Sequence, residues 1–213
     1  MALPHNGKIE IKKPKLLLVE GTDAYYFCIW ALTAYGIENV QVLDFGGITQ
    51  LHGYLKALVL LPGYETVKTV VVARDAETKP GTAMVSIKKA LQRSGLSAPT
   101  TPFEFSGDGP RVAFILFPGF DGAGKVQPGT LEDLCSHILK DHDTERLACV
   151  EAYLRCLIDQ GKNVKWKHKS FLHAYFAGDD RFVGMKIGEA SKAGAWNWEH
   201  ENLLSFKNTI KAM

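Results

Sequence analysis

Four short apolar runs occur in the first part of the chain, and each has the length of a buried β-strand. They cover residues 16–19, 40–45, 67–73 and 112–117. A continuous apolar run is typical of a parallel strand, because helices cover both faces of a parallel sheet. We therefore expect these four runs to form one mainly parallel sheet.

Helical patterns separate the strands. Residues 23–35, 48–61 and 80–94 carry apolar positions at helical spacing, and glycine or proline follows each segment. Strands that alternate with helices over short connections favour right-handed crossovers in an α/β fold. Residues 97–110 and 119–129 are rich in glycine, proline and small polar residues, which is typical of loops.

The pattern changes after Pro118, because the remaining apolar positions recur only at helical spacing. Amphipathic helices are expected near residues 131–139 and 147–158, and a last one over 199–211. We predict an α/β core over residues 1–128 and a helical part over 129–213 that packs on it to form one compact unit.

Bulk composition narrows the classes of protein. The chain has 213 residues with a net charge of +2, so any contact with nucleic acid must come from a local basic patch. No apolar run reaches 18 residues, and residues 1–15 lack the apolar stretch of a secretion signal. We expect a cytoplasmic protein without a membrane span.

The cysteines show no pairing pattern. Cys28, Cys135, Cys149 and Cys156 are far apart, and no two of them form a C-x-x-C motif. This spacing favours buried, reduced thiols over a zinc site or a disulfide framework.

Acidic residues follow two of the expected strands. Glu20 ends the first strand, with Asp23 three residues later, and Asp75 and Glu77 end the third. The carboxyl ends of parallel strands meet at one edge, where sites are built. Clustered carboxylates repel unless a cation neutralises them, and oxygen ligands suit Mg²⁺ or Mn²⁺. A helix-capping role remains equally open for Asp23.

These residues resemble a known signature. The segment Leu-Leu-Val-Glu-Gly at 17–21 and Arg-Asp-Ala-Glu at 74–77 are similar to the Toprim signature of primases, topoisomerases and OLD-type nucleases. In that signature, one strand ends in Glu-Gly and a later strand ends in Asp-x-Asp. Gly-Gly at 46–47, Gly-Thr-Leu-Glu-Asp-Leu at 129–134 and Trp-Asn-Trp-Glu-His at 196–200 resemble a small stand-alone Toprim-like family without assigned function.

The resemblance implies a Toprim-like fold and specific roles. Glu20, Asp75 and Glu77 would be metal ligands, Glu132 would be a further one, and Glu20 and Asp75 would be the catalytic pair. The chain departs from the pattern twice, because Glu77 replaces the second aspartate and Ala24 stands where many relatives carry an acid.

Basic residues supply candidate phosphate contacts. The run at 162–169 interleaves Lys165, Lys167 and Lys169 with Trp166, a combination that can follow a phosphate backbone and stack on a base. The same run could equally be a solvated connection between helices. Arg74 and Lys125 are weaker candidates. Residues 119–125 have the spacing of a phosphate loop, but Val126 replaces the required hydroxyl and Pro128 prevents the helix.

Two classes of function compete. The first is metal-dependent phosphodiester cleavage or phosphoryl transfer on nucleic acid with Mg²⁺ or Mn²⁺. The second is a non-catalytic Toprim-like module that binds nucleic acid or a nucleotide for a partner protein. A small-molecule phosphotransferase on a similar sheet is a third interpretation.

Overall fold

Four strands form one sheet in which all neighbouring pairs are parallel. The computed structural model describes residues 9–140 and 143–213, so most of the segment used in the secretion argument lies outside the described residues. The strand order is β2-β1-β3-β4. The strands are β1 (Lys15–Val19), β2 (Val40–Asp44), β3 (Thr69–Asp75) and β4 (Arg111–Phe117). The α/β class and the parallel four-stranded sheet are confirmed.

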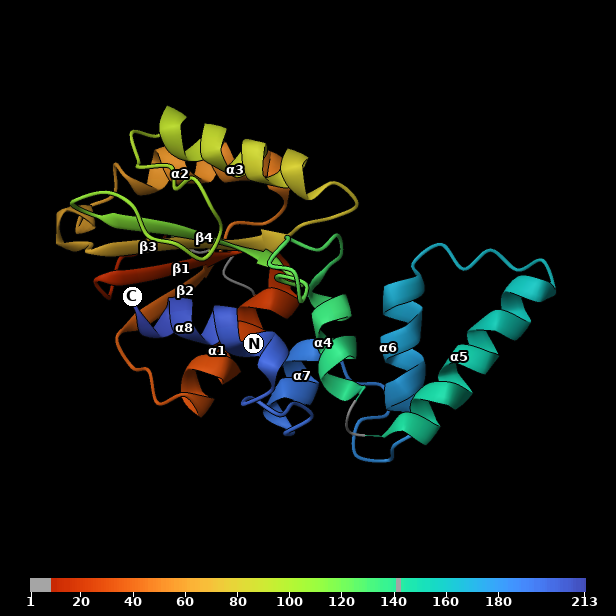
Figure 1. Ribbon diagram of the computed structural model, residues 1–213. Helices are drawn as coiled ribbons and strands as arrows, with labels where there is room; N and C mark the ends of the chain where they lie inside the picture. The colour runs from red at the N-terminus through yellow and green to blue at the C-terminus, as the bar shows by residue number, and fades with distance from the viewer. Residues whose placement is uncertain (1–8, 141–142) are drawn as a thin grey trace.

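Helices cover both faces of the sheet (Figure 1). One face carries α2 (Leu51–Leu58) and α3 (Pro80–Arg93), whereas the other carries α1 (Gly21–Ala34), α7 (Ile187–Lys192) and α8 (Leu204–Lys211). Beside them, α4 (Leu131–Leu139) leads to α5 (Thr144–Asp159) and α6 (Lys167–Ala177), and these last two helices project from the body. None of the described helices combines the length and the apolar character that a membrane span requires.

Several boundaries differ from the prediction. The helix expected over 48–61 is a 3-10 turn followed by α2, which ends at Leu58, because Pro62 has no N–H to donate to the Leu58 carbonyl and its ring would clash with it. The helix expected over 199–211 also opens with a 3-10 turn. The third strand extends to Asp75, and Arg74 and Asp75 pair with Leu116 and Phe117. This last shift matters most, because it fixes both residues in the sheet.

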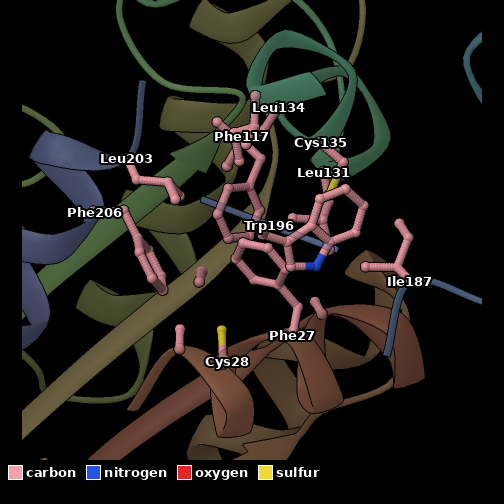
Figure 2. Packing of buried hydrophobic residues seen from close by; sticks show 14 of the residues in the cluster. Phe27, Cys28, Phe117, Leu131, Leu134, Cys135, Ile187, Trp196, Leu203 and Phe206 are labelled. Atoms are coloured by element: carbon pink, nitrogen blue, oxygen red, sulfur yellow. The ribbon is translucent and has the colours of Figure 1, made fainter. Parts of the chain in front are cut away.

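Each face of the sheet carries its own apolar cluster. Leu16, Leu18 and Val72 pack under α2 and α3, while Leu17, Val19 and Ala73 pack against α1 and the C-terminal helices. Side chains alternate between faces along a strand, which explains this division. Figure 2 shows the second cluster, in which Phe27 of α1 packs against Phe117 of β4 and Phe206 of α8. Leu131, Ile187 and Trp196 belong to the same cluster. The C-terminal helices therefore complete the core of the sheet.

The thiols follow the packing of their helices. Cys28 and Cys135 are buried, as expected, but Cys149 and Cys156 are exposed, so that prediction was wrong for them. Both lie on α5, which buries only Leu147 and Val150 because the rest of the helix projects away from the core. All four thiols are free.

Candidate functional site at the carboxyl edge of the sheet

Glu20 directly follows β1 and forms an ion pair with a residue of β3. Its Oε2 lies 3.3 Å from Nε of Arg74, and its Oε1 accepts a hydrogen bond from Ile48 N at 3.0 Å. Burial raises the pKa of Glu20, although Arg74 and the Ile48 N–H oppose the rise. The Arg74 side chain is only 5% exposed. One expected metal ligand is thus held beside a buried guanidinium.

Asp44 ends β2 and organises the loops around Glu20. Its Oδ1 accepts hydrogen bonds from Gly21 N at 2.9 Å and from Gly46 N at 2.8 Å. Gly21 and Gly46 both have positive φ, which glycine adopts without steric cost. Asp44 was not among the predicted site residues, although an acid in the second expected strand, two residues before Gly46-Gly47, was a usable signal.

Asp75 ends β3 and receives the first backbone N–H of α4. Its Oδ1 accepts a hydrogen bond from Leu131 N at 2.9 Å. Burial raises the pKa of Asp75 to about 7, with further contributions from the negative charges of Glu132, Glu20 and Glu77, while the Leu131 N–H opposes the rise. An aspartate that titrates near neutral pH is common at functional sites.

Glu77 reaches the edge by an unexpected route. The sequence placed Asp75 and Glu77 together at the end of the third strand. In the structure, β3 ends at Asp75, and Glu77 lies beyond it with a left-handed φ of 56°. Its backbone exchanges two hydrogen bonds of 2.9 Å with Gly129. This pairing ties the turn after β3 to the segment that precedes α4, and so brings Leu131 N to Asp75.

Glu132 pairs with a lysine from a distant helix. Its Oε1 lies 3.2 Å from Nζ of Lys169 on α6, and its side chain is only 10% exposed. Burial would raise the pKa of Glu132, but its own N–H, the Thr130 side chain and Lys169 together lower it. A cavity of about 110 Å³ beside this pair is also lined by Asp23, His173 and Lys186.

The position of Asp23 settles part of its role. It lies in the first turn of α1, and the N-cap residue is Glu20. The pKa of Asp23 is raised by burial and by the charge of Glu132. Asp23 therefore belongs to the acidic side of the cavity and does not act as a helix cap.

The acids share one edge but lie on two sides of the sheet. Side chains alternate between the two faces, so Glu20 and Arg74 lie on the same face as Leu18 and Val72, toward α2 and α3. Asp75 lies on the same face as Ala73, toward α1 and α4. Among residues 9–140 and 143–213, no group of three or more His, Cys, Asp or Glu is close enough together to hold a metal ion. The electrostatic influence of Glu20 on Asp75 nevertheless crosses between the two sides.

The remaining basic candidates are spread more widely. Lys125 is exposed in a tight turn, where its N–H donates to Asp121. Lys165 and Trp166 lie at the end of the connection between α5 and α6, and Lys165 Nζ lies 4.9 Å from the Trp166 ring centroid. Lys167 and Lys169 belong to the first turn of α6. Only Lys169 contacts an acid of the site.

The fold and this edge define an α/β protein with a parallel sheet, three of whose four strands end at or just before a carboxylate. Comparison with family models then assigns the chain to one family. Residues 14–213 match the family described as protein of unknown function, DUF3226, and the chain belongs to it. No curated protein and no solved structure matches the chain.

Proposed function

We propose that this protein carries out divalent-metal-dependent phosphodiester cleavage or phosphoryl transfer on nucleic acid. The observation that carries the proposal is Asp75, whose pKa of about 7 reflects burial and the negative charge gathered around it. Three other acids contribute to that charge or to the same edge: Glu20, Glu77 and Glu132. The resemblance of residues 17–21 and 74–77 to the Toprim signature points to the same chemistry.

The residues fit Mg²⁺ or Mn²⁺ in one specific way. The donors are carboxylate oxygens, which these hard cations prefer, and the charge around Asp75 favours a cation. No trio of acids is gathered within the described residues. Mg²⁺ is commonly bound through only one or two carboxylates, with water and substrate phosphates completing the shell. Asp75 and Glu132, which lie on the same side of the sheet, would hold the ion, and Glu20 and Glu77 would add negative charge at the edge.

Each side chain has a distinct task in this proposal. A bound divalent cation would polarise a phosphate oxygen and activate a water. Leu131 N orients the Asp75 carboxylate, and Asp44 fixes the loop that starts beside Glu20. Arg74 is buried beside Glu20, where its guanidinium offsets the charge of that carboxylate.

Internal ion pairs favour a second candidate, a non-catalytic module that binds nucleic acid or a nucleotide. Glu20 already has Arg74 as a counter-ion, and Glu132 has Lys169. In such a module, both lysine and arginine would shift to the phosphates of the ligand, and no metal would be needed.

One experiment separates the two candidates. Purified protein is incubated with labelled DNA and RNA in Mn²⁺, in Mg²⁺ and in EDTA. Cleavage that EDTA stops, and that Asp75→Asn abolishes, supports the enzyme. Binding that persists in EDTA without cleavage in any metal selects the module.

A further inference from the structure

Helices α5 and α6 form a hairpin that stands away from the sheet (Figure 1). Residues of both helices and of the connection between them line an open groove. The groove has a volume of about 880 Å³. Its walls are mainly apolar and aromatic, and they include Tyr153, Leu154, Leu157, Val164 and Trp166. Large apolar side chains are therefore turned toward solvent on this hairpin.

Two aromatic rings of the groove are unusually exposed. Trp166 is 56% exposed and Tyr153 is 55% exposed. Exposed rings of this size are platforms on which nucleic-acid bases stack, and stacking tolerates every base because each has a π-face. A duplex hides these faces, so a stacking groove selects unpaired nucleotides.

Charge identifies the occupant. The groove is lined by Arg146, Lys165 and His173, and none of the described residues that line it is a carboxylate. Residues 160–169, of which 163–166 line the groove, contain four lysines and no acid. Arg146 is already paired with Asp143 and Asp179, so the lysines are the cations available to a ligand. A protein helix that docked through apolar side chains would gain nothing from these lysines, whereas the phosphates of a polyanion would pair with them.

One residue is shared by the groove and the cavity beside the candidate site. His173 of α6 lines both the groove and the cavity that holds Glu132 and Lys169. The helix that carries Trp166 at its N-cap thus reaches the acidic edge within its first turn, at Lys169.

From these observations we infer that the α5–α6 hairpin is a binding arm for single-stranded nucleic acid. Bases stack on Trp166 and Tyr153, and Lys162, Lys165 and Lys167 contact the phosphates. Cleavage of the bound strand rests on the proposed function. Binding of the strand does not depend on the metal and can be tested without it.

The test measures binding in EDTA, so that it is independent of cleavage. Labelled single strands and duplexes of about 16 nucleotides are titrated by fluorescence anisotropy. We expect the single strand to bind more tightly. Trp166→Ala should weaken that binding about 5-fold or more, and Trp166→Phe should restore most of it. Leu60→Ala, at another exposed apolar position, is the matched control and should bind as the wild type does.

Salt dependence tests the lysines separately. Replacing Lys165 and Lys167 by Ala should lower the slope of log affinity against log salt by about 0.7 for each lost contact on a single strand. Lys56→Ala and Lys88→Ala on the opposite face of the sheet should leave the slope unchanged.

Three results would overturn the inference: equal affinity for duplex and single strand, no effect of Trp166→Ala, or a dimer that Trp166→Ala dissociates. If the protein binds single strands but cleaves none in any metal, the proposed enzyme activity is refuted and the proposed binding arm is supported. Circular dichroism of each variant verifies that it is folded.

Discussion

At the scale of single residues, Asp75 both accepts a hydrogen bond from the backbone and belongs to the group of acids at the edge of the sheet. Its position at the end of a buried strand removes it from water, and the other acids of the edge add repulsion. Both effects favour the neutral carboxyl group. The same residue orients the N-terminus of α4 through Leu131 N. Its charge and its hydrogen bond can be separated by substitution, because Asn keeps the oxygen and loses the charge.

The first prediction concerns the stability of the metal-free protein. Because the folded-state pKa of Asp75 is about 7, the native state binds a proton that the unfolded state releases near pH 4. The contribution of Asp75 to stability is therefore full below pH 4 and falls as pH rises to about 7. Asp75→Asn should remove this fall. We expect the mutant to gain about 2 kcal/mol relative to wild type between pH 5 and pH 8.

Urea unfolding in EDTA at both pH values measures the difference. Asp108→Asn, at an exposed acid of the loop over 97–110, is the control and should show no such change. A structural Asp75 would give the opposite result, since its loss would then destabilise the protein at pH 8.

The second prediction concerns metal at the same residue. A cation that binds only the native state raises its melting temperature by mass action. Mn²⁺ should therefore raise the melting temperature of the wild type and leave that of Asp75→Asn almost unchanged. Thermal melts of both proteins in EDTA and in Mn²⁺ decide the point. Equal shifts in the two proteins would place the metal elsewhere.

At the scale of elements, α4 and α6 meet through the pair of Glu132 and Lys169. The pair joins residues 37 positions apart in a sequence whose periodicity says nothing of which helices become neighbours. Lys169 is about half exposed, whereas Glu132 is largely buried, so loss of the lysine leaves a carboxylate with poor access to water. The pair is thus a contact whose two halves respond differently to substitution.

The third prediction uses this asymmetry. Lys169→Met should lower the free energy of unfolding in EDTA by about 1 kcal/mol, and adding Glu132→Gln should restore it. If Glu132 supports a metal, Lys169→Met should also tighten Mn²⁺ binding, because the competing cation is gone. Titration calorimetry measures that affinity. Lys167→Met, at an exposed lysine of the same turn, should change neither quantity, and unchanged Mn²⁺ affinity in Lys169→Met would remove Glu132 from the ligand set.

At the scale of the whole molecule, the sequence predicted the sheet better than the contacts across it. The four apolar runs and the helical segments between them were enough to predict the strands. They also predicted that Glu20 and Asp75 would lie at one edge of the sheet. The ion pair of Glu20 with Arg74 was not predictable, because the relevant strand extends two residues beyond its apolar run. The exposure of Cys149 also escaped prediction, since an amphipathic pattern does not reveal whether a helix has a layer to pack on.

The α1–α7 interface holds the C-terminal part of the chain on the core. The short distance between these two helices depends on one glycine. Gly188 of α7 lies against Tyr26 of α1, where an added Cβ would stand 2.5 Å from the tyrosine Cβ. That atom is anchored to the α1 backbone and cannot turn away. Any side chain at position 188 must therefore push the two helices apart.

The last prediction compares two helical glycines with opposite surroundings. Gly188→Ala should destabilise the protein by about 1–3 kcal/mol, because overpacking separates α7 from α1 and loosens the core beneath. Gly53→Ala in α2 should instead stabilise it by about 0.5–1 kcal/mol, because Gly53 is exposed, no atom lies within 4 Å of the new Cβ, and alanine favours the helix. Denaturant unfolding of both variants measures the two signs. A stabilising Gly188→Ala would mean that α7 does not pack closely on α1.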